Sequence, residues 1–425
     1  MSVADKINFL RYIGSKVENY ETIRAGKINL NLPVEQIDKT EHTAVKEYFL
    51  NSKNNFSSKP FGTGTNFYLD FNIDKVDYTF HQFLLKFTLT NNGSTALNTL
   101  LSPLIVERVQ ILKDGNIFSS YDTTDWDLLF SNLNKINHEY NTNDYSILNV
   151  GFDSNNRLTS NSIPANSSST VQIELPIPLA RSKLHSLSIK NFIVIRVYFK
   201  SAISVSGPVD SLIGLSNVSL VLRVKELTEK AKLNLVKQPK ITHMFMKKVI
   251  NKYSIQQLNA GQNYKINLQG FNNIASLALI YLTYPQYNVA SSSTENNIWY
   301  NLPFRISNVY ITDGSGLNIN NNIKYDVNYN KYLLEDYFKK FNLSLRQLSK
   351  TGNYDGQLFV LPFCGNDKDV YNSPFLGGYN FKNENDYILN FQSLDGSSTS
   401  VEVYILWFIP SIVDLCYGNI DEHIA

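Results

Sequence analysis

Two stretches of this sequence decide its fold: VQILKDG at residues 109–115 and VYITDG at residues 309–314. Each is rich in β-branched and aliphatic residues, which favour a β-strand. Each ends in Asp-Gly, a dipeptide that suits a hairpin turn because glycine accepts a positive φ. A second short strand is expected after each turn, at residues 116–120 and 317–319. The hairpins lie about 200 residues apart, which is a spacing of domain size.

The segments that follow the two hairpins repeat the same order of elements. First comes a patch with apolar and aromatic residues at helical spacing, at residues 126–136 and 329–341. A strand that runs into proline comes next, at residues 173–178 and 359–363, and proline marks the end or edge of a strand because it cannot donate to the ladder. Each half then closes with strongly apolar strands. The repeat spans most of residues 65–410, so the sequence predicts one β-domain present twice.

Strands are predicted where apolar and polar residues alternate, as they do around Phe67, Leu69, Phe71 and Ile73. The expected fold class is all-β, with two tandem β-sandwiches of about eight strands each, because this number of strands separated by polar loops is typical of sandwiches. The dense apolar run at residues 401–409 suits a strand that is buried on both faces or packed at an interface. The predicted strands lie at residues 67–73, 83–89, 105–112, 117–118, 171–175, 192–199 and 218–224 in the first half, and at residues 264–268, 275–281, 306–311, 357–361, 387–391 and 401–408 in the second.

The N-terminal region differs from the rest of the chain. Ile7, Leu10, Ile13 and Val17 recur at three- and four-residue spacing, which predicts an amphipathic helix, and a second short helix is expected at residues 44–49. Such a helix either packs on its own domain or forms an arm that touches a neighbouring subunit or a membrane surface. The expected parts of the chain are a partly helical arm at 1–58, a first sandwich at 59–225, a Lys- and Glu-rich linker at 226–245, a second sandwich at 246–415 and a tail at 416–425.

Composition and charge exclude several classes of protein. The 425 residues carry 39 Lys and Arg against 37 Asp and Glu, a formal net charge of +2, so bulk charge does not indicate a nucleic-acid-binding protein. We recognise no signal peptide and no transmembrane run, which predicts synthesis in the cytosol. The two cysteines, Cys364 and Cys416, are too few for a disulfide scaffold and lack the spacing of metal ligands.

The sequence contains no constellation that indicates catalysis or metal binding, and no catalytic, cofactor-binding or metal-binding residue is predicted. No zinc-binding spacing, nucleophile elbow or phosphate-binding glycine loop is present. Residues 313–316 weakly resemble a calcium loop and are predicted to form a polar turn. The lysines between Lys225 and Lys240 are interleaved with Glu226 and Glu229, which favours a solvated face between domains. The six histidines are scattered singly, at His42, His81, His138, His185, His243 and His423.

The duplicated sandwich, the helix after each central hairpin and the amphipathic N-terminal segment together resemble a double jelly-roll major capsid protein. This family occurs in tailless icosahedral viruses, among them bacteriophages with an internal membrane, adenovirus and several large DNA viruses. The resemblance implies two eight-stranded jelly rolls in a non-enzymatic structural protein of the virion. It also implies a homotrimer with a pseudo-sixfold outline, because each chain supplies two similar domains.

The same resemblance implies the partners of the chain. They are further copies of the chain, in the trimer and in neighbouring capsomers, and minor capsid or penton proteins, with no sequence-specific nucleic acid. An internal viral membrane is a further candidate partner for the N-terminal arm. The loops at residues 144–170 and 290–297 are expected to form outer towers.

Two other functions fit a pair of aromatic-rich sandwiches. A carbohydrate-binding or adhesin-type protein would stack sugars on exposed aromatic side chains, but it is expected to be exported or to form a fibre-like repeat. A polysaccharide lyase or glycosidase is the third candidate. A glycosidase requires paired carboxylates in a cleft, and no such pair is recognisable in the sequence.

Overall fold

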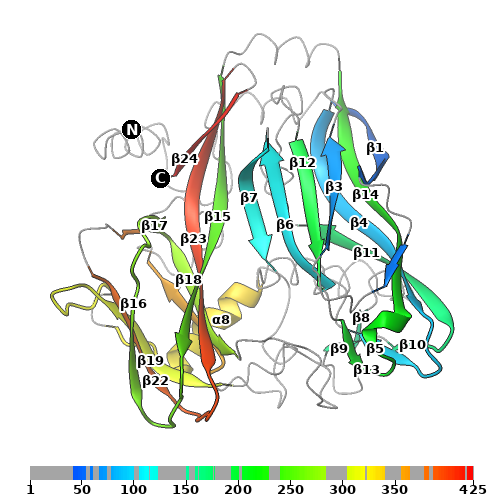
Figure 1. Ribbon diagram of the computed structural model, residues 1–425. Coiled ribbons are helices and arrows are strands. Elements are labelled where there is room, and N and C mark those ends of the chain that lie inside the picture. The colour runs from blue at the N-terminus through cyan, green and yellow to red at the C-terminus, as the bar shows by residue number, and fades with distance from the viewer. Residues whose placement is uncertain are drawn as a thin grey trace.

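A computed structural model of the 425-residue chain describes two β-sandwiches that lie side by side (Figure 1). The described residues are 42–53, 58–60, 67–73, 78–99, 105–113, 115–122, 150–152, 158–160, 162–175, 177, 193–200, 203–228, 240–283, 304–320, 323–339, 356–363, 378–381, 386–416 and 419–424.

The first sandwich consists of two antiparallel sheets. Strand β2 (Ser58–Pro60) pairs with the beginning of β14, beside β1. In order of pairing, the sheet with the longer strands contains β1 (His42–Asn51), β14 (Ile213–Leu227), β4 (Tyr78–Asn91) and β11 (Ser167–Leu175), and the opposing sheet contains β3 (Phe67–Ile73), β12 (Ile193–Phe199), β6 (Val106–Lys113) and β7 (Asn116–Asp122).

The second sandwich has the same design. Strand β24 (Asn419–Ile424) adds to its longer sheet by pairing with the distal half of β23. In order of pairing, the longer sheet contains β15 (Lys240–Ile255), β23 (Val401–Cys416), β18 (Leu277–Thr283) and β20 (Leu358–Pro362), and the opposing sheet contains β16 (Asn263–Asn267), β22 (Ile388–Ser393) and β19 (Ile306–Thr312).

The strand order confirms the internal repeat. The longer sheet has the order β1-β14-β4-β11 in the first sandwich and the corresponding order β15-β23-β18-β20 in the second. The two strands that run into proline, β11 and β20, therefore occupy the same position. The corresponding strands are β1 and β15, β3 and β16, β4 and β18, β6 and β19, β11 and β20, β12 and β22, and β14 and β23.

The two hairpins of the repeat differ in detail. In the first sandwich, β6 and β7 are paired up to the turn, where Lys113 lies opposite Asn116. Gly115 in this turn has the positive φ of 83° that the turn requires. In the second, the strand predicted at residues 317–319 is reduced to an isolated bridge between Thr312 and Asn318. Here Gly316, rather than Gly314, takes the positive φ of 83°, so the turn is wider.

Alternating apolar side chains fill the space between the sheets of each sandwich. In the first, Phe83, Leu85, Phe87 and Leu89 of β4 are fully buried, and so is Phe199 of the opposing sheet. In the second, the ring of Trp407 stacks on that of Phe271 at 4.0 Å between centroids. Residues 403–410 of β23 are all buried, which confirms a strand buried on both faces. The buried residues of both sandwiches form one continuous cluster.

The predicted strands are confirmed wherever the structure describes them, except the one at residues 317–319, but the short helix expected at residues 44–49 is wrong. These residues belong to β1, which pairs with β14 from His42↔Leu227 to Asn51↔Ser219. The pairing satisfies every second backbone group of β1 and outweighs the local helical spacing. The helical pattern from Ile7 to Val17 lies outside the described residues.

The ends of the sandwiches extend beyond the expected parts. Strand β14 ends at Leu227 and β15 begins at Lys240, so both reach into the stretch expected to be a linker. Strand β24 occupies most of the expected tail. On one side of β23, β18 pairs with residues 402–408 and β24 pairs with residues 411–416. In the first sandwich, the single strand β4 pairs with β14 from Ile213 to Glu226.

Helix α8 (Val327–Lys339) confirms the helix predicted in the second half, although it begins two residues earlier than expected. Residues 340 and 341 of the predicted helix lie outside the described residues. The corresponding patch at residues 126–136 lies outside the described residues.

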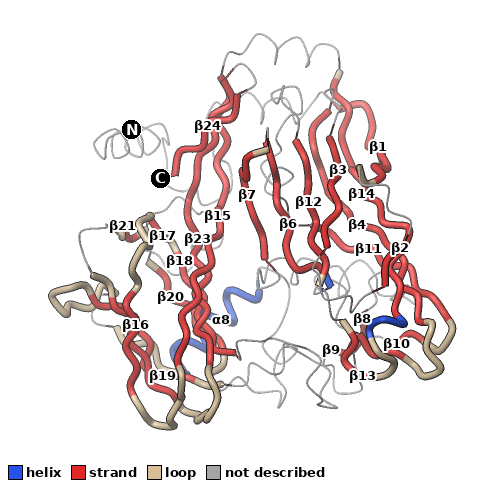
Figure 2. The backbone as a smooth tube through the Cα atoms, in the orientation of Figure 1, coloured by secondary structure: helices blue, strands red, loops and turns tan. Residues whose placement is uncertain are grey.

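Short strands cover the ends of both sandwiches (Figure 2). Within residues 144–170, which are expected to form an outer tower, the described parts include two hairpin strands and a strand of a small sheet, in which Ile163 is buried, and the tower stays a prediction. Residues 290–297 lie outside the described residues. The additional elements are β8 (Val150–Phe152) with β9 (Leu158–Ser160), β10 (Ser162–Ile163) with β5 (Leu97–Thr99) and β13 (Ser204–Ser206), β17 (Ile274–Ala275) with β21 (Tyr379–Asn380), and the 3-10 helix η2 (Asp210–Leu212).

Candidate assembly surfaces

The two sandwiches meet through strands at the edges of their sheets. Strand β7 ends the shorter sheet of the first sandwich, and β15 ends the longer sheet of the second. These two edge strands contact each other and lie adjacent in the ribbon (Figure 1). The joint therefore unites different edges of two similar domains.

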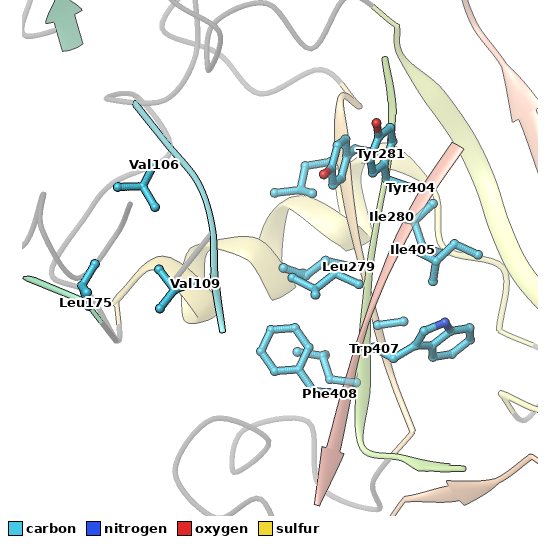
Figure 3. Close-up of a cluster of buried hydrophobic side chains, with 14 of the residues drawn as sticks. Val106, Val109, Leu175, Leu279, Ile280, Tyr281, Tyr404, Ile405, Trp407 and Phe408 are labelled. Carbon is cyan, nitrogen blue, oxygen red and sulfur yellow. The ribbon is translucent and has the colours of Figure 1, made fainter. Parts of the chain in front are cut away.

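The outer face of the second sandwich's longer sheet is apolar and buried. Leu279, Leu406 and Phe408 alternate with residues that point into the sandwich, yet they are at most 5 % exposed. Figure 3 shows Leu279 and Phe408 on the side of the sheet where α8 and β6 of the first sandwich lie, and Trp407 and Ile405 on the other side. An outer face this apolar is expected where two domains remain permanently packed.

Lysines flank this apolar face. Lys248 Nζ lies 5.3 Å from the ring centroid of Phe408, and Lys252 Nζ lies 4.9 Å from that of Tyr404. The Tyr404 ring stacks on Tyr281 at 5.2 Å, and the Tyr404 hydroxyl donates a 2.7 Å hydrogen bond to Glu402 Oε2. Cations over aromatic rings keep their charge near solvent while their stems cover apolar surface.

The outer face of the first sandwich's shorter sheet carries an ordered ladder of polar and aromatic side chains. Arg196 binds Asp70 in bidentate fashion, with Nε–Oδ1 at 2.7 Å and Nη2–Oδ2 at 2.9 Å. Its guanidinium also lies 4.2 Å from the ring centroid of Tyr68. The hydrogen bond to Asp70 outweighs the effect of burial and raises the pKa of Arg196 further above its usual value. The strand register places these three residues on one face.

The ladder continues along the same face. The Arg108 guanidinium lies 4.1 Å from the ring centroid of Tyr198, whose hydroxyl donates to Gln110 Oε1 at 3.1 Å. Sequence reasoning did not identify any of these residues as a group. They come from three strands. The signal that could have identified them was the presence of charged and aromatic residues at the outward positions of β3, β6 and β12.

Two asparagines attach the hairpin and α8 to the edge of β20. The Asn330 side chain donates to Leu358 O and accepts from Val360 N, both at 2.8 Å. Asn320 Nδ2 donates to Pro362 O at 2.9 Å. The free edge of the strand is thereby satisfied by side chains, which protects it from pairing with another chain.

Several large apolar side chains remain exposed on the outside of the molecule. They fall mainly on β1, on the two hairpins of the repeat, on η2 and on α8. The set comprises Phe49, Tyr68, Ile117, Val209, Leu212, Leu317, Ile323, Tyr329 and Tyr332.

Within the ranges given above, no three His, Cys, Asp or Glu side chains come together as a metal site. Asp313 Oδ1 accepts hydrogen bonds from Ser315 Oγ, Ser315 N and Leu317 N, which lower the pKa of its carboxyl. These bonds use the carboxylate within its own turn, which confirms the polar turn predicted at residues 313–316. No described helix combines the length and the apolar character needed to cross a membrane.

Known proteins resemble this chain in fold but not in sequence. No family model and no curated protein matches the sequence. Solved structures nevertheless match: VP54 of PBCV-1 aligns with a TM-score of 0.59 at 10% identity, over 90% of this chain and 97% of that chain. The Faustovirus major capsid protein gives 0.54 at 10% identity, over 88% and 90%. A chain of the Sputnik virophage structure gives 0.53 at 10% identity, over 91% and 89%.

These alignments include both sandwiches in their order along the chain. The fold is the double jelly roll. The resemblance inferred from the repeated hairpins is thereby confirmed as a likeness of fold.

Proposed function

We propose that this chain is the major capsid protein of an icosahedral virus, with three copies forming a pseudo-hexagonal capsomer. The observation that carries the proposal is the duplicated strand order within one chain. Two domains of the same topology, joined edge to edge, supply two of the six similar positions in such a ring. The likeness to capsid structures over both sandwiches supports it.

The proposed role is structural and non-enzymatic. Its support is the use of the polar side chains, which bind one another in ladders and turns on the surfaces described above. The proposed location is the capsid of the virion, after synthesis in the host cytoplasm. Other copies of the chain and minor capsid or penton proteins are the proposed partners.

Native mass tests this proposal directly. The purified chain should form a species of about 145 kDa, three times its mass of 48.4 kDa. Negative-stain images should show particles with a hexagonal outline. A stable monomer would overturn the proposal, and a glycan-binding screen would then examine the alternative of a carbohydrate-binding pair of sandwiches.

The division of the chain and its N-terminal arm are part of the proposal. We infer two jelly rolls joined by a connection after β14, with residues before β1 forming a helical arm that touches neighbouring capsomers or an internal membrane. The amphipathic spacing of Ile7, Leu10 and Ile13 supports the arm. Deletion of residues 1–25 should leave the trimer intact but impair shell assembly. Normal assembly of the truncated trimer would disprove the role of the arm.

A further inference from the structure

The sequence contains a single Asn-Gly dipeptide, Asn92-Gly93, which follows directly after β4. Asparagine is a thermolabile residue. A following glycine makes it more reactive, because no side chain shields the backbone nitrogen that attacks the asparagine amide. Whether Asn92 reacts therefore depends on how the fold holds the backbone nitrogen of Gly93.

Deamidation of Asn92 would consume only water. Gly93 N loses its proton to the solvent and attacks Asn92 Cγ, so that an N–Cγ bond forms. The Cγ–Nδ2 bond then breaks, and Nδ2 takes up a proton and leaves as ammonia. Water opens the remaining cyclic imide at either of its two carbonyl carbons. The product is aspartate or isoaspartate, and a neutral amide has become a carboxylate.

In the folded chain, the Gly93 amide is occupied by a side chain. Gly93 N donates to Asn91 Oδ1 at 2.8 Å, and both residues are buried, whereas Asn92 is exposed. The Asn91 side chain is itself fixed, because three carbonyl oxygens surround its Nδ2 at 2.9 to 3.1 Å. These oxygens belong to Thr95, Ile163 and Pro164. The proton that must leave Gly93 N therefore points at a fixed oxygen inside the protein.

Neighbouring backbone groups hold the dipeptide from both sides. Asn92 N donates to Leu212 O at 2.9 Å, and Gly93 O accepts from Asn166 N at 3.3 Å. Pro208 packs so closely that a Cβ added at position 93 would lie 2.4 Å from Pro208 Cβ. Packing therefore requires glycine at position 93, so the fold retains a dipeptide that is chemically labile.

From this geometry we infer that Asn92 is a deamidation site that the folded protein keeps closed through Asn91. The reaction proceeds when this end of the first sandwich opens and Gly93 N leaves Asn91 Oδ1. Because the released ammonia is lost, a negative charge at position 92 is a lasting record of such an opening. The inference concerns a single chain and does not depend on the proposed capsid function.

Rates of deamidation in the full-length protein test the inference. Mass spectrometry of proteolytic fragments would follow the conversion of Asn92 during storage at neutral pH. A synthetic peptide of residues 88–97 supplies the rate of the same dipeptide without the fold. The folded protein should convert at least about tenfold more slowly, because several buried hydrogen bonds must break first. Equal rates in the protein and the peptide would overturn the inference.

The matched control is Asn92→Gln, which keeps an amide side chain and the backbone bonds of position 92. Glutamine forms its cyclic imide far more slowly, so the fragment from this variant should show no conversion. Conversion at the parent rate in the Asn92→Gln protein would place the modification on another residue and would overturn the assignment.

Low concentrations of urea show whether the reaction needs an opening. Below the unfolding transition, urea should accelerate both the deamidation of Asn92 and the hydrogen exchange of the Gly93 amide, with the same dependence on concentration. Both processes require Gly93 N to leave Asn91 Oδ1. Faster exchange at a constant rate of deamidation would show that Asn92 reacts in the closed state, contrary to the inference.

Removal of the acceptor gives an independent measurement. Asn91→Ala should raise the deamidation rate of Asn92 at least about fivefold, the equivalent of one hydrogen bond. Amides of β12 in the opposing sheet should stay protected from hydrogen exchange, which verifies that the sandwich remains folded. An unchanged rate in a folded Asn91→Ala protein would disprove the role of Asn91. If the substitution unfolds the sandwich, the comparison in urea decides.

Discussion

At the scale of single residues, Arg305 and Asp395 join two segments that lie 90 residues apart in the chain. Asp395 accepts from Arg305 N at 2.7 Å and from Arg305 Nη2 at 2.7 Å. Burial acts to raise the pKa of the Asp395 carboxyl, but the hydrogen bonds and charge of Arg305 outweigh burial and hold that pKa below its usual value. The ionised carboxylate therefore stabilises this end of the second sandwich.

The depressed pKa makes this contribution to stability dependent on pH. It is fully present above the unfolded-state pKa of about 3.9 and is lost as pH falls through the folded-state pKa. Asp395→Asn should therefore lower the free energy of unfolding at pH 7 by about 1 kcal/mol, a value discounted for partial exposure. Chemical denaturation across pH should show the difference from the parent protein shrinking below about pH 4.

The exposed Asp386 supplies a control for this measurement. Asp386→Asn should change the free energy of unfolding little at any pH. A difference between Asp395→Asn and the parent protein that stayed constant down to pH 2 would show that the carboxylate's charge is not the source of the stabilisation.

Ion pairs between residues far apart in the chain could not be predicted from the sequence. Asp70 and Arg196 are 126 residues apart, and their contact depends on the register between β3 and β12. A slip of one residue would send both side chains to the other face. The alternating pattern predicts the strands, but it does not fix which residue lies opposite which.

At the scale of elements, α8 is positioned on β20 by a side chain that replaces a strand partner. Asn330 is fully buried and makes both a donor and an acceptor bond to the β20 backbone. Asn330→Ala should lower the free energy of unfolding by about 2–4 kcal/mol, because two backbone groups lose their partner inside the protein. Thermal or chemical denaturation would measure the loss.

Asn328 on the same helix is exposed and provides a matched control. Asn328→Ala should change the free energy of unfolding by less than about 0.5 kcal/mol. Similar losses for the two substitutions would show that the bonds to β20 do not determine the effect.

Strand β24 provides a second test at this scale. Deletion of residues 419–425 should leave the sandwich folded but remove one of the two partners of β23 between Ser411 and Cys416, where β15 remains paired on the other side. Hydrogen exchange of backbone amides in this segment should accelerate, while amides of β23 opposite β18 remain protected. Equal protection in the full-length and truncated proteins would show that the β23–β24 pairing contributes nothing to local stability.

The elements show where sequence reasoning succeeded and where it failed. Long strands such as β12 and β23 were predicted correctly because their alternating or continuous apolar residues are typical of strands that face a sandwich core. Strand β1 was mistaken for a helix because Tyr48 and Phe49 fit a helical spacing locally. Its strand conformation depends on β14, which is more than 160 residues away in the chain. The exposed edge residues of the candidate assembly surface had no sequence signal, because exposure depends on which domain stands beside them.

At the scale of the whole molecule, the two sandwiches share one buried cluster. Their unfolding should therefore be coupled. Phe87→Ala, in the core of the first sandwich, should cost about 3–5 kcal/mol and lower the melting temperature of both sandwiches. Calorimetry should show one transition, and hydrogen exchange in β18 should report the loss at a distance.

The equivalent substitution in the core of the second sandwich is the control. Phe391→Ala, in the core of the second sandwich, should lower the melting temperature of the first in the same way. If β18 and β23 melted at an unchanged temperature in the Phe87→Ala protein, the sandwiches would be independent folding units.

The two sandwiches differ in when their longer sheets can be completed as the chain leaves the ribosome. The first sandwich finds all of its long sheet once β14 has been synthesised, because β4 accompanies β14 to its end. The second sandwich lacks the strand beside the distal half of β23 until Asn419–Ile424 have emerged. Translation that stops a few codons early therefore yields a protein with an open sheet edge, which quality-control proteases and wrong strand partners can recognise.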